Sequence, residues 1–488
     1  MEKYKALIGL EMHCEVSETN TKVFSPSANS YATEANINVN AIDMAFPGVL
    51  PVVNKEAVRK ALMASIILNC TQPEYLYFER KNYYYPDLPK GYQITQETKP
   101  APVGIYGELE YMLNGEKKVA KINNIHLEED AASLDHYSNY SLIDYNRAGV
   151  PLLELVTEPC FTNADEAVAF LETMRSIYQY SGISEADSKK GQIRCDVNVS
   201  IMDSELDASA PKNWGTKVEV KNVNSFSAVR EAINYEISGQ IEAKENGTYS
   251  EIKQQTRRWD DANKCTVFMR DKADAIDYKY FIEPNIPKIK ISKEWLDEIR
   301  ESIPELPNER MNRYLNEYGL NSVDAHTLIK EKNISDYFDK VISLGGNAKD
   351  ACNWITTRLL GYLNKEEKML EEVYMTPEVM YELMKLVSDG KISTQQAKEV
   401  FQLCLTEEKH PIDIVKEKGM EQVSDEGEII ALVNKVLDEN EAAIETYKSG
   451  KTNILGFLVG QVLKSSGGKF NPALTNKILT QELEKRWD

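Results

Sequence analysis

Three segments of this 488-residue chain alternate strictly between apolar and polar residues. They span residues 8–16, 193–201 and 216–223, and the polar side of the first carries Glu11 and His13. A period of two places successive side chains on opposite faces of a β-sheet. The pattern therefore predicts a sheet with one face packed in a core and one polar face.

The polar positions of these segments hold an unusual set of side chains. Carboxylates recur there with a histidine and several cations: Glu11, His13, Glu15, Arg194, Asp196, Lys217, Glu219 and Lys221. Glu11 and His13 are two residues apart, so they project side by side, as ligation of a divalent ion requires. Lys217 and Lys221 flank Glu219 and are placed to hold phosphate oxygens beside such an ion. An ordinary sheet with one solvated face is the alternative.

A second acidic cluster is His126-Leu-Glu-Glu-Asp130. Three consecutive acids repel one another unless they are solvated or share a cation. The segment is therefore either part of a metal site or a solvated acidic turn. It does not match H-E-x-x-H, which excludes the zinc-protease interpretation.

Glu154 is isolated among aliphatic residues in Leu-Leu-Glu-Leu-Val, after a turn-forming stretch that contains Asn146 and Arg147. A buried carboxylate without a partner is costly. We therefore expect Glu154 to have a partner, either in a functional site or in an ordinary salt bridge.

Common nucleotide-binding and nucleophile motifs are absent from the sequence. It contains no G-x-x-x-x-G-K-[ST] loop, no G-x-G-x-x-G and no G-x-S-x-G. Nucleotide chemistry would have to use carboxylate-held metal with scattered basic donors, such as Arg80-Lys81-Asn82 or Arg257-Arg258. The tyrosine-rich stretch 83–92 has two interpretations, stacking on a base or core packing.

Composition changes near residue 292. Residues 1–292 hold 13 of the 18 prolines and 19 of the 26 tyrosines, with many short alternating segments, which is typical of an α+β domain. The rest of the chain has helical patterns. We expect domains at 1–292, 293–405 and 406–488.

Three helices are predicted from spacing and end signals. One covers residues 164–180 and ends at Gly182, and another follows Ser225. A third opens at Thr376-Pro377 and stops at Gly390.

The formal net charge of −20 argues against a protein that coats nucleic acid through uniform positive charge. Residues 446–488 differ, with seven basic and three acidic side chains, whereas residues 407–445 have 12 acids and 4 bases. The seven cysteines never form a C-x-x-C pair, and no run of apolar residues is long enough to span a membrane. We expect a cytoplasmic protein with reduced thiols, no zinc and no membrane partner.

Long motifs across the chain resemble one family, the B subunits of the tRNA-dependent amidotransferase GatCAB. The matching segments are IGLEMH at the start, AFPGVLPVVN at 45–54, RKNYYYPDLPKGYQITQ at 80–96, HLEEDA at 126–131, DYNRAGVPLLELVTEP at 144–159, IRCDVNVSI at 193–201, GTKVEVKNVNSF at 215–226 and GFLVGQVLK at 456–464. Their number and order make a chance match very improbable.

The resemblance implies an α+β cradle domain on a largely antiparallel sheet, an all-α helical domain, and a small helical tail that contacts tRNA. It implies an enzyme subunit that uses ATP and Mg²⁺ to phosphorylate the side-chain carboxylate of Glu on tRNA(Gln), or of Asp on tRNA(Asn). Ammonia from glutamine, made by a partner A subunit, then displaces the phosphate, and a small C subunit holds the A and B subunits together.

Carried onto this sequence, the resemblance places a catalytic and a metal site on the residues isolated above. The catalytic candidates are Glu11, His13, Glu129, Glu154, Asp196 and Glu219. The metal candidates are Glu11, His13, Glu128, Glu129 and Glu154, and the candidates for binding ATP are Arg80, Lys81, Asn82, Arg147, Lys217 and Lys221.

The chain departs from the family pattern at a few positions. Ile282 and Asn285 replace a proline and an acid of the family's DYRYFPEPD segment, and Gln255 replaces a glutamate. We interpret these positions as peripheral to the carboxylates. Two other functions are considered beside the enzyme subunit: a non-catalytic scaffold that docks tRNA for the amidase, and an independent metal-dependent phosphohydrolase.

Overall fold

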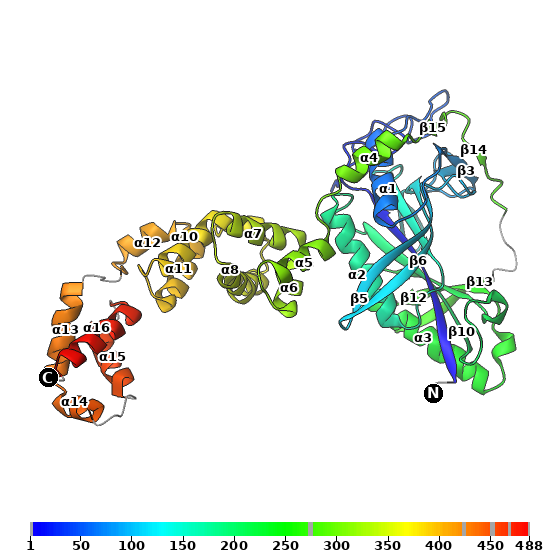
Figure 1. The fold of residues 1–488 in the computed structure, drawn as a ribbon. Coiled ribbons are helices and arrows are strands. Elements are labelled where there is room, and N and C mark those ends of the chain that lie inside the picture. The colour runs from blue at the N-terminus through cyan, green and yellow to red at the C-terminus, as the bar shows by residue number, and fades with distance from the viewer. Residues whose placement is uncertain (1–2, 272–276, 422–425, 449–453, 467–469, 487–488) are drawn as a thin grey trace. The chain divides into compact units, whose positions relative to one another are not determined.

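The computed structural model describes residues 3–271, 277–421, 426–448, 454–466 and 470–486 (Figure 1). Contacts divide the chain into two compact units, Met1–Pro307 and Asn308–Asp488. The first unit combines sheets and helices, and the second is helical. The prediction of an α+β region followed by a helical region is therefore confirmed.

An eight-stranded sheet is the centre of the first unit. Its strand order is β13-β12-β11-β10-β1-β9-β6-β5, and every neighbouring pair is antiparallel except β11 and β12. The strands are β1 (Tyr4–Glu15), β5 (Gly104–Leu113), β6 (Glu116–Glu129), β9 (Pro151–Thr157), β10 (Ile193–Asp203), β11 (Val218–Val223), β12 (Gln255–Asp260) and β13 (Cys265–Asp271). The three segments predicted as strands form β1, β10 and β11.

Helices α1 (Lys55–Ile67), α2 (Ala164–Tyr180) and α3 (Phe226–Glu245) pack on one face of this sheet (Figure 1). The predicted bounds of α2 are confirmed, because the Asn163 side chain accepts a hydrogen bond from Glu166 N and Gly182 follows with φ of +66°. The Ser225 side chain caps α3 in the same way. The apolar side of the alternating strands is buried under these helices.

Smaller sheets flank the large one. They are a three-stranded sheet of β14 (Phe281–Ile282), β3 (Glu79–Asn82) and β4 (Tyr92–Thr95), a pair of β2 (Tyr75–Leu76) and β15 (Ile289–Lys290), and a hairpin of β7 (Ser133–His136) and β8 (Ser141–Asp144). The three-stranded sheet contacts the end of β6 through β4. This contact places β4 beside the acidic end of β6.

The helical region contains two separate apolar cores, one from Tyr314 to Val415 and one from Ile429 to Leu483. Its helices are α5 (Pro307–Asn316), α6 (Ser322–Ile329), α7 (Lys332–Ser343), α8 (Ala348–Trp354), α9 (Leu360–Glu366), α10 (Pro377–Ser388), α11 (Thr394–Glu407), α12 (Pro411–Glu417), α13 (Glu426–Asp438), α14 (Glu441–Lys448), α15 (Ile454–Ser465) and α16 (Pro472–Lys485). The helix predicted at Thr376-Pro377 is confirmed as α10, with Thr376 as its cap.

The expected domain boundary at residue 292 precedes α4 (Lys293–Glu301), and α4 packs on α1 in the first unit. Ile299 of α4 belongs to the same apolar core as the large sheet. The three-domain division stays a prediction. Among the described residues, no helix combines the length and the apolar character needed to cross a bilayer.

A buried ion pair anchors the long segment between β1 and α1. The side chain of Lys22 is 0% exposed and its Nζ lies 3.6 Å from Asp43 Oδ2, while Ser25 donates a hydrogen bond to Asp43 Oδ1. Lys22 Nζ also donates to Tyr145 O at 3.3 Å, which connects this segment to the chain before β9. Burial lowers the pKa of Lys22, and the Asp43 carboxylate counteracts that shift.

Substitution Asp43→Ala is expected to lower the free energy of unfolding of the first unit by about 3–5 kcal/mol, because it leaves the Lys22 ammonium buried without its counter-ion. The matched control is Glu108→Ala, which removes the partner of Lys121 in an exposed ion pair and should cost about 0–1 kcal/mol. Urea denaturation measures both. Equal losses of stability in the two variants would contradict the role of Asp43 as the counter-ion of the buried Lys22.

Candidate functional site

Four neighbouring strands bring polar residues to one level of the sheet. The register pairs His13 of β1 with Arg194 of β10 on one side and with Glu154 of β9 on the other. Glu154 is in turn paired with His126 of β6. Directly paired residues in an antiparallel sheet point to the same face. The strand order therefore assembles residues that are up to 181 positions apart in sequence into one row.

Glu154 is the centre of this row. Its Oε2 lies 3.2 Å from His13 Nε2 and 3.4 Å from His126 Nε2. His13 Nε2 is also 3.8 Å from Glu11 Oε1, and His126 Nε2 is 3.7 Å from Glu128 Oε2. The partner that the sequence predicts for Glu154 is thus a pair of imidazoles, one on each side.

Burial and charge set the ionisation of the cluster. Burial alone would raise the pKa of Glu154, but the two histidines hold it well below its usual value. Burial also disfavours charged His13 and His126, yet Glu154 raises the pKa of both, with Glu128 contributing at His126. Glu11 differs, because burial and repulsion from Glu154 raise its pKa to about 7. The charge of Glu154 therefore depends on the two histidines beside it, unlike that of an isolated surface acid.

The donor set suits a divalent cation. Ligand atoms of Glu11, His13 and Glu154 lie within 4.8 Å of one another, and so do those of His126, Glu128 and Glu154. Carboxylates are ligands for Mg²⁺ and Mn²⁺, while imidazole favours transition metals. A cation bound between these groups would take over the charge compensation that protonated histidines provide to Glu154.

The cluster at 126–130 is not a turn. Residues up to Glu129 belong to β6, and His126, Glu128, Glu129 and Asp130 are all buried, so the alternative of a solvated acidic turn is wrong. The buried charges have partners instead. Asp130 Oδ1 accepts a hydrogen bond from Arg194 at 2.9 Å, and its Oδ2 lies 3.6 Å from Arg147 Nε.

Glu129 lies apart from the Glu154 cluster. Adjacent strand residues point to opposite faces, so Glu129 is directed away from Glu128. Its carboxylate accepts a hydrogen bond from Ile94 N at 2.8 Å and forms an ion pair with Lys90. Glu129 is thus the one predicted metal candidate outside both groups of converging ligand atoms.

Asp196 and Glu219 extend the polar face toward β11. Asp196 is paired with Glu11 across the strands, and its Oδ2 lies 2.5 Å from Lys221 Nζ. Lys221 Nζ is also 3.7 Å from Glu219 Oε1, and Glu219 accepts a hydrogen bond from Thr256 at 2.8 Å. Lys221 therefore contacts carboxylates of β10 and β11. Burial opposes the charge of Lys221, but Asp196, Glu11 and Glu219 together raise its pKa.

The other candidates for binding ATP lie in different surroundings. Arg80 forms an ion pair with Glu283 at 2.5 Å, and Asn82 donates to the backbone oxygens of Tyr278 and Lys279. Arg147 donates to Ala131 O and Ala132 O beside Asp130. Lys217 is exposed and precedes the first residue of β11. Lys81 lies 5.1 Å from the ring of Tyr278.

Two positions were not singled out from the sequence. Thr95 of β4 donates a hydrogen bond to Glu128 Oε2 at 3.0 Å, and Tyr280 is a half-buried residue whose pKa is raised by burial and by nearby carboxylates that include Glu154. Tyr280 belongs to the segment whose departures from the family pattern, at Ile282 and Asn285, we interpreted as peripheral. No pattern in the sequence around Tyr280 indicates a role in the site, because only the pairing of β14 with β3 brings this residue close to the Glu154 cluster.

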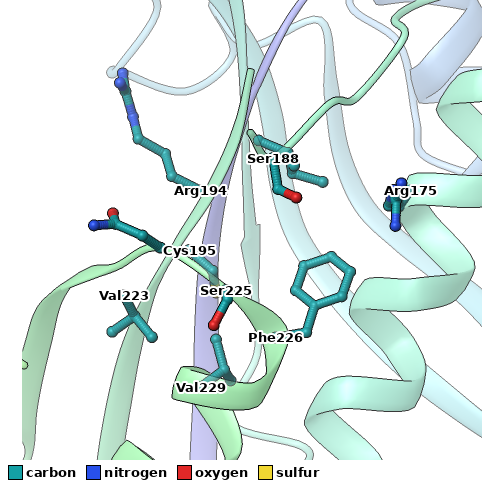
Figure 2. A pocket seen from close by; sticks show the side chains of 10 residues that line it. Arg175, Ser188, Arg194, Cys195, Val223, Ser225, Phe226 and Val229 are labelled. Atoms are coloured by element: carbon teal, nitrogen blue, oxygen red, sulfur yellow. The ribbon is translucent and has the colours of Figure 1, made fainter. Parts of the chain in front are cut away.

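A small cavity of about 190 Å³ lies elsewhere, at the start of α3 (Figure 2). Its lining includes Ile193, Cys195 and Val223 of the apolar core and Phe226, which packs against that core. Apart from Arg194, none of the candidate site residues described above lines it. Charged groups converge in the Glu154 cluster and not at this cavity, so the cluster is the candidate site.

Comparison with known proteins identifies the family of the chain. A family model described as the GatB/GatE catalytic domain matches residues 6–297, and a GatB domain model matches residues 336–483. Curated B subunits of aspartyl/glutamyl-tRNA(Asn/Gln) amidotransferases from Shouchella clausii, Oceanobacillus iheyensis and Geobacillus thermodenitrificans are each 44% identical over 484 residues, which cover 99% of this chain and 100% of each relative. The chain therefore belongs to the family of B subunits of aspartyl/glutamyl-tRNA(Asn/Gln) amidotransferases.

Proposed function

We propose that this chain is the subunit that activates and amidates misacylated tRNA. It phosphorylates the side-chain carboxylate of Glu-tRNA(Gln), Asp-tRNA(Asn) or both with ATP, and ammonia from a glutaminase partner then displaces the phosphate. The observation that carries this proposal is the buried cluster in which Glu154 lies between His13 and His126, with Glu11 and Glu128 at its edges.

The cluster suits phosphoryl transfer to a carboxylate. Both reactants are anions, so the reaction needs fixed positive charge where the phosphoryl group passes. A bound Mg²⁺ would supply Lewis-acid neutralisation of that charge. Glu154 would hold it together with Glu11 and His13 or with Glu128 and His126, the two groups whose ligand atoms converge. The histidine that is not a ligand would orient Glu154 from the neighbouring strand.

Cationic side chains around the cluster are candidates for the nucleotide phosphates. Lys221 lies beside Asp196, across the strands from Glu11, and Arg147 lies beside Asp130. We propose these two residues and Lys81 as the contacts of the triphosphate. Arg80 forms an ion pair with Glu283, and Asn82 binds the backbone of residues 278–279. We therefore propose that these two residues hold β3, the strand that carries Lys81, in place.

Substitution Glu154→Gln is expected to lower kcat for ATP-dependent amide formation by about 100-fold or more, because it removes the shared carboxylate that organises the metal ligands. The measurement uses the complex reconstituted with the A and C subunits, misacylated tRNA, ATP and glutamine. The matched control is Glu108→Gln, an exposed glutamate of β5. Glutamine hydrolysis by the partner serves as an internal reference that neither change should abolish.

Retained amidation in Glu154→Gln would contradict the catalytic assignment and favour the tRNA-docking scaffold. Hydrolysis of a simple phosphoester by the chain alone, without tRNA, would favour the phosphohydrolase. Separate assays with Glu-tRNA(Gln) and Asp-tRNA(Asn) identify the substrate.

The helical unit that we propose to contact tRNA includes residues that precede the basic stretch 446–488. Helices α15 and α16, within the basic stretch 446–488, share one apolar core with α13 of the acidic stretch. Counted from Glu426, this unit has nine acidic and eight basic side chains. Lys485 and Arg486 are paired with Glu482 and Asp438. Lys451 and Lys469 of the basic stretch lie outside the described residues.

Deleting residues 446–488 would therefore expose the apolar face of α13 as well as remove charge. A cleaner test is the double substitution Lys464→Gln and Lys477→Gln, because both lysines are exposed on α15 and α16. If the tail meets the tRNA backbone, the salt dependence of tRNA affinity should become shallower by about one to two counter-ions. Unchanged affinity and salt slope would contradict tRNA contact at these helices.

A further inference from the structure

The three-stranded sheet β14-β3-β4 has one face directed at the Glu154 cluster. Thr95 of β4 fixes this direction through its hydrogen bond to Glu128. The register pairs Thr95 with Glu79 and Gln93 with Lys81, so these four side chains share that face. The opposite face carries Arg80 with the rings of Tyr92 and Phe281, which lie 4.1 Å and 5.5 Å from its guanidinium.

Tyr280 immediately precedes β14, and strand alternation extended to this residue directs its side chain to the face that meets the cluster. Phe281 is paired with Arg80 on the opposite face, and the preceding residue alternates with it. The Tyr280 ring lies 6.1 Å from that of Tyr278, above which Lys81 is placed. The electrostatic influence of Glu128 and Glu154 on the Tyr280 hydroxyl agrees with this position.

Lys81 and Tyr280 are donors available to a ligand. Among the residues that the structure describes, no carboxylate forms an ion pair with Lys81 Nζ, and no group forms a hydrogen bond with the Tyr280 hydroxyl. Most basic candidates nearby are engaged, as Lys90 is with Glu129 and Arg80 with Glu283. Two unengaged donors at the edge of a carboxylate cluster would stabilise an anion brought there.

We propose that Tyr280 is a substrate-binding residue whose hydroxyl donates a hydrogen bond to an oxygen of the phosphoryl group while that group passes to the substrate carboxylate. Lys81 provides positive charge to the same oxygens. This inference rests on the proposed function and adds a residue to it. The tyrosine keeps its proton throughout, since burial and the surrounding carboxylates raise its pKa. A neutral donor is suited to this position, because it approaches an anion without adding a further negative charge.

The test compares Tyr280→Phe with the wild type in the reconstituted complex. The change removes the hydroxyl and keeps the ring that packs on Tyr278. We expect kcat for ADP formation with misacylated tRNA, measured without glutamine, to fall about 10- to 100-fold, with KM for tRNA unchanged. Amide formation with glutamine should fall equally. The matched control is Tyr92→Phe on the opposite face of the same small sheet, which should behave as the wild type.

Unchanged kcat in Tyr280→Phe, with or without a change in KM, overturns the inference. An equal loss in Tyr92→Phe, or a lowered thermal midpoint of unfolding in Tyr280→Phe, also overturns it, because the effect would then come from the sheet and not from the hydroxyl. A wild-type complex that forms neither ADP nor amide overturns the proposed function and with it this inference. An active wild type with an equally active Tyr280→Phe overturns the inference alone.

Discussion

The carboxylate of Glu154 lies between two imidazoles, and the rest of the site depends on this contact. A single buried glutamate among aliphatic residues would be costly, but His13 and His126 approach it from the two neighbouring strands. The arrangement requires β9 to lie between β1 and β6, with the register set so that all three side chains meet at one level. The strand order therefore assembles the cluster as well as packing the core.

Local signals in the sequence predicted much of the fold. Period-two alternation identified β1, β10 and β11, and helical spacing with the end signals at Gly182, Ser225 and Thr376-Pro377 located α2, α3 and α10. These predictions rest on side-chain direction and on backbone N–H groups at helix ends, both of which depend on near neighbours. The family resemblance, which rests on long motifs, is confirmed by the two matching domain models.

The arrangement of the site could not be obtained in this way. The acids at 128 and 129 look equivalent in sequence, yet strand alternation sends Glu128 to the Glu154 cluster and Glu129 to Lys90. The acidic residues 128–130 were also not recognised as the end of a buried strand. Their partners Arg194 and Thr95 are distant in the chain, so the local sequence does not show that the charges are compensated. Tyr280 depends on the pairing of β14 with β3, about 200 residues apart. Pairing between segments so far apart cannot be predicted from the local periodicity of either segment.

The most direct test of the central claim is to locate a divalent cation in crystals of the protein grown with Mn²⁺. Anomalous scattering identifies the ion independently of catalysis. We expect, as the central claim requires, a peak coordinated by Glu154 together with Glu11 and His13, or with His126 and Glu128. A peak confined to other acidic residues, or no peak in the cluster at saturating Mn²⁺, would contradict it.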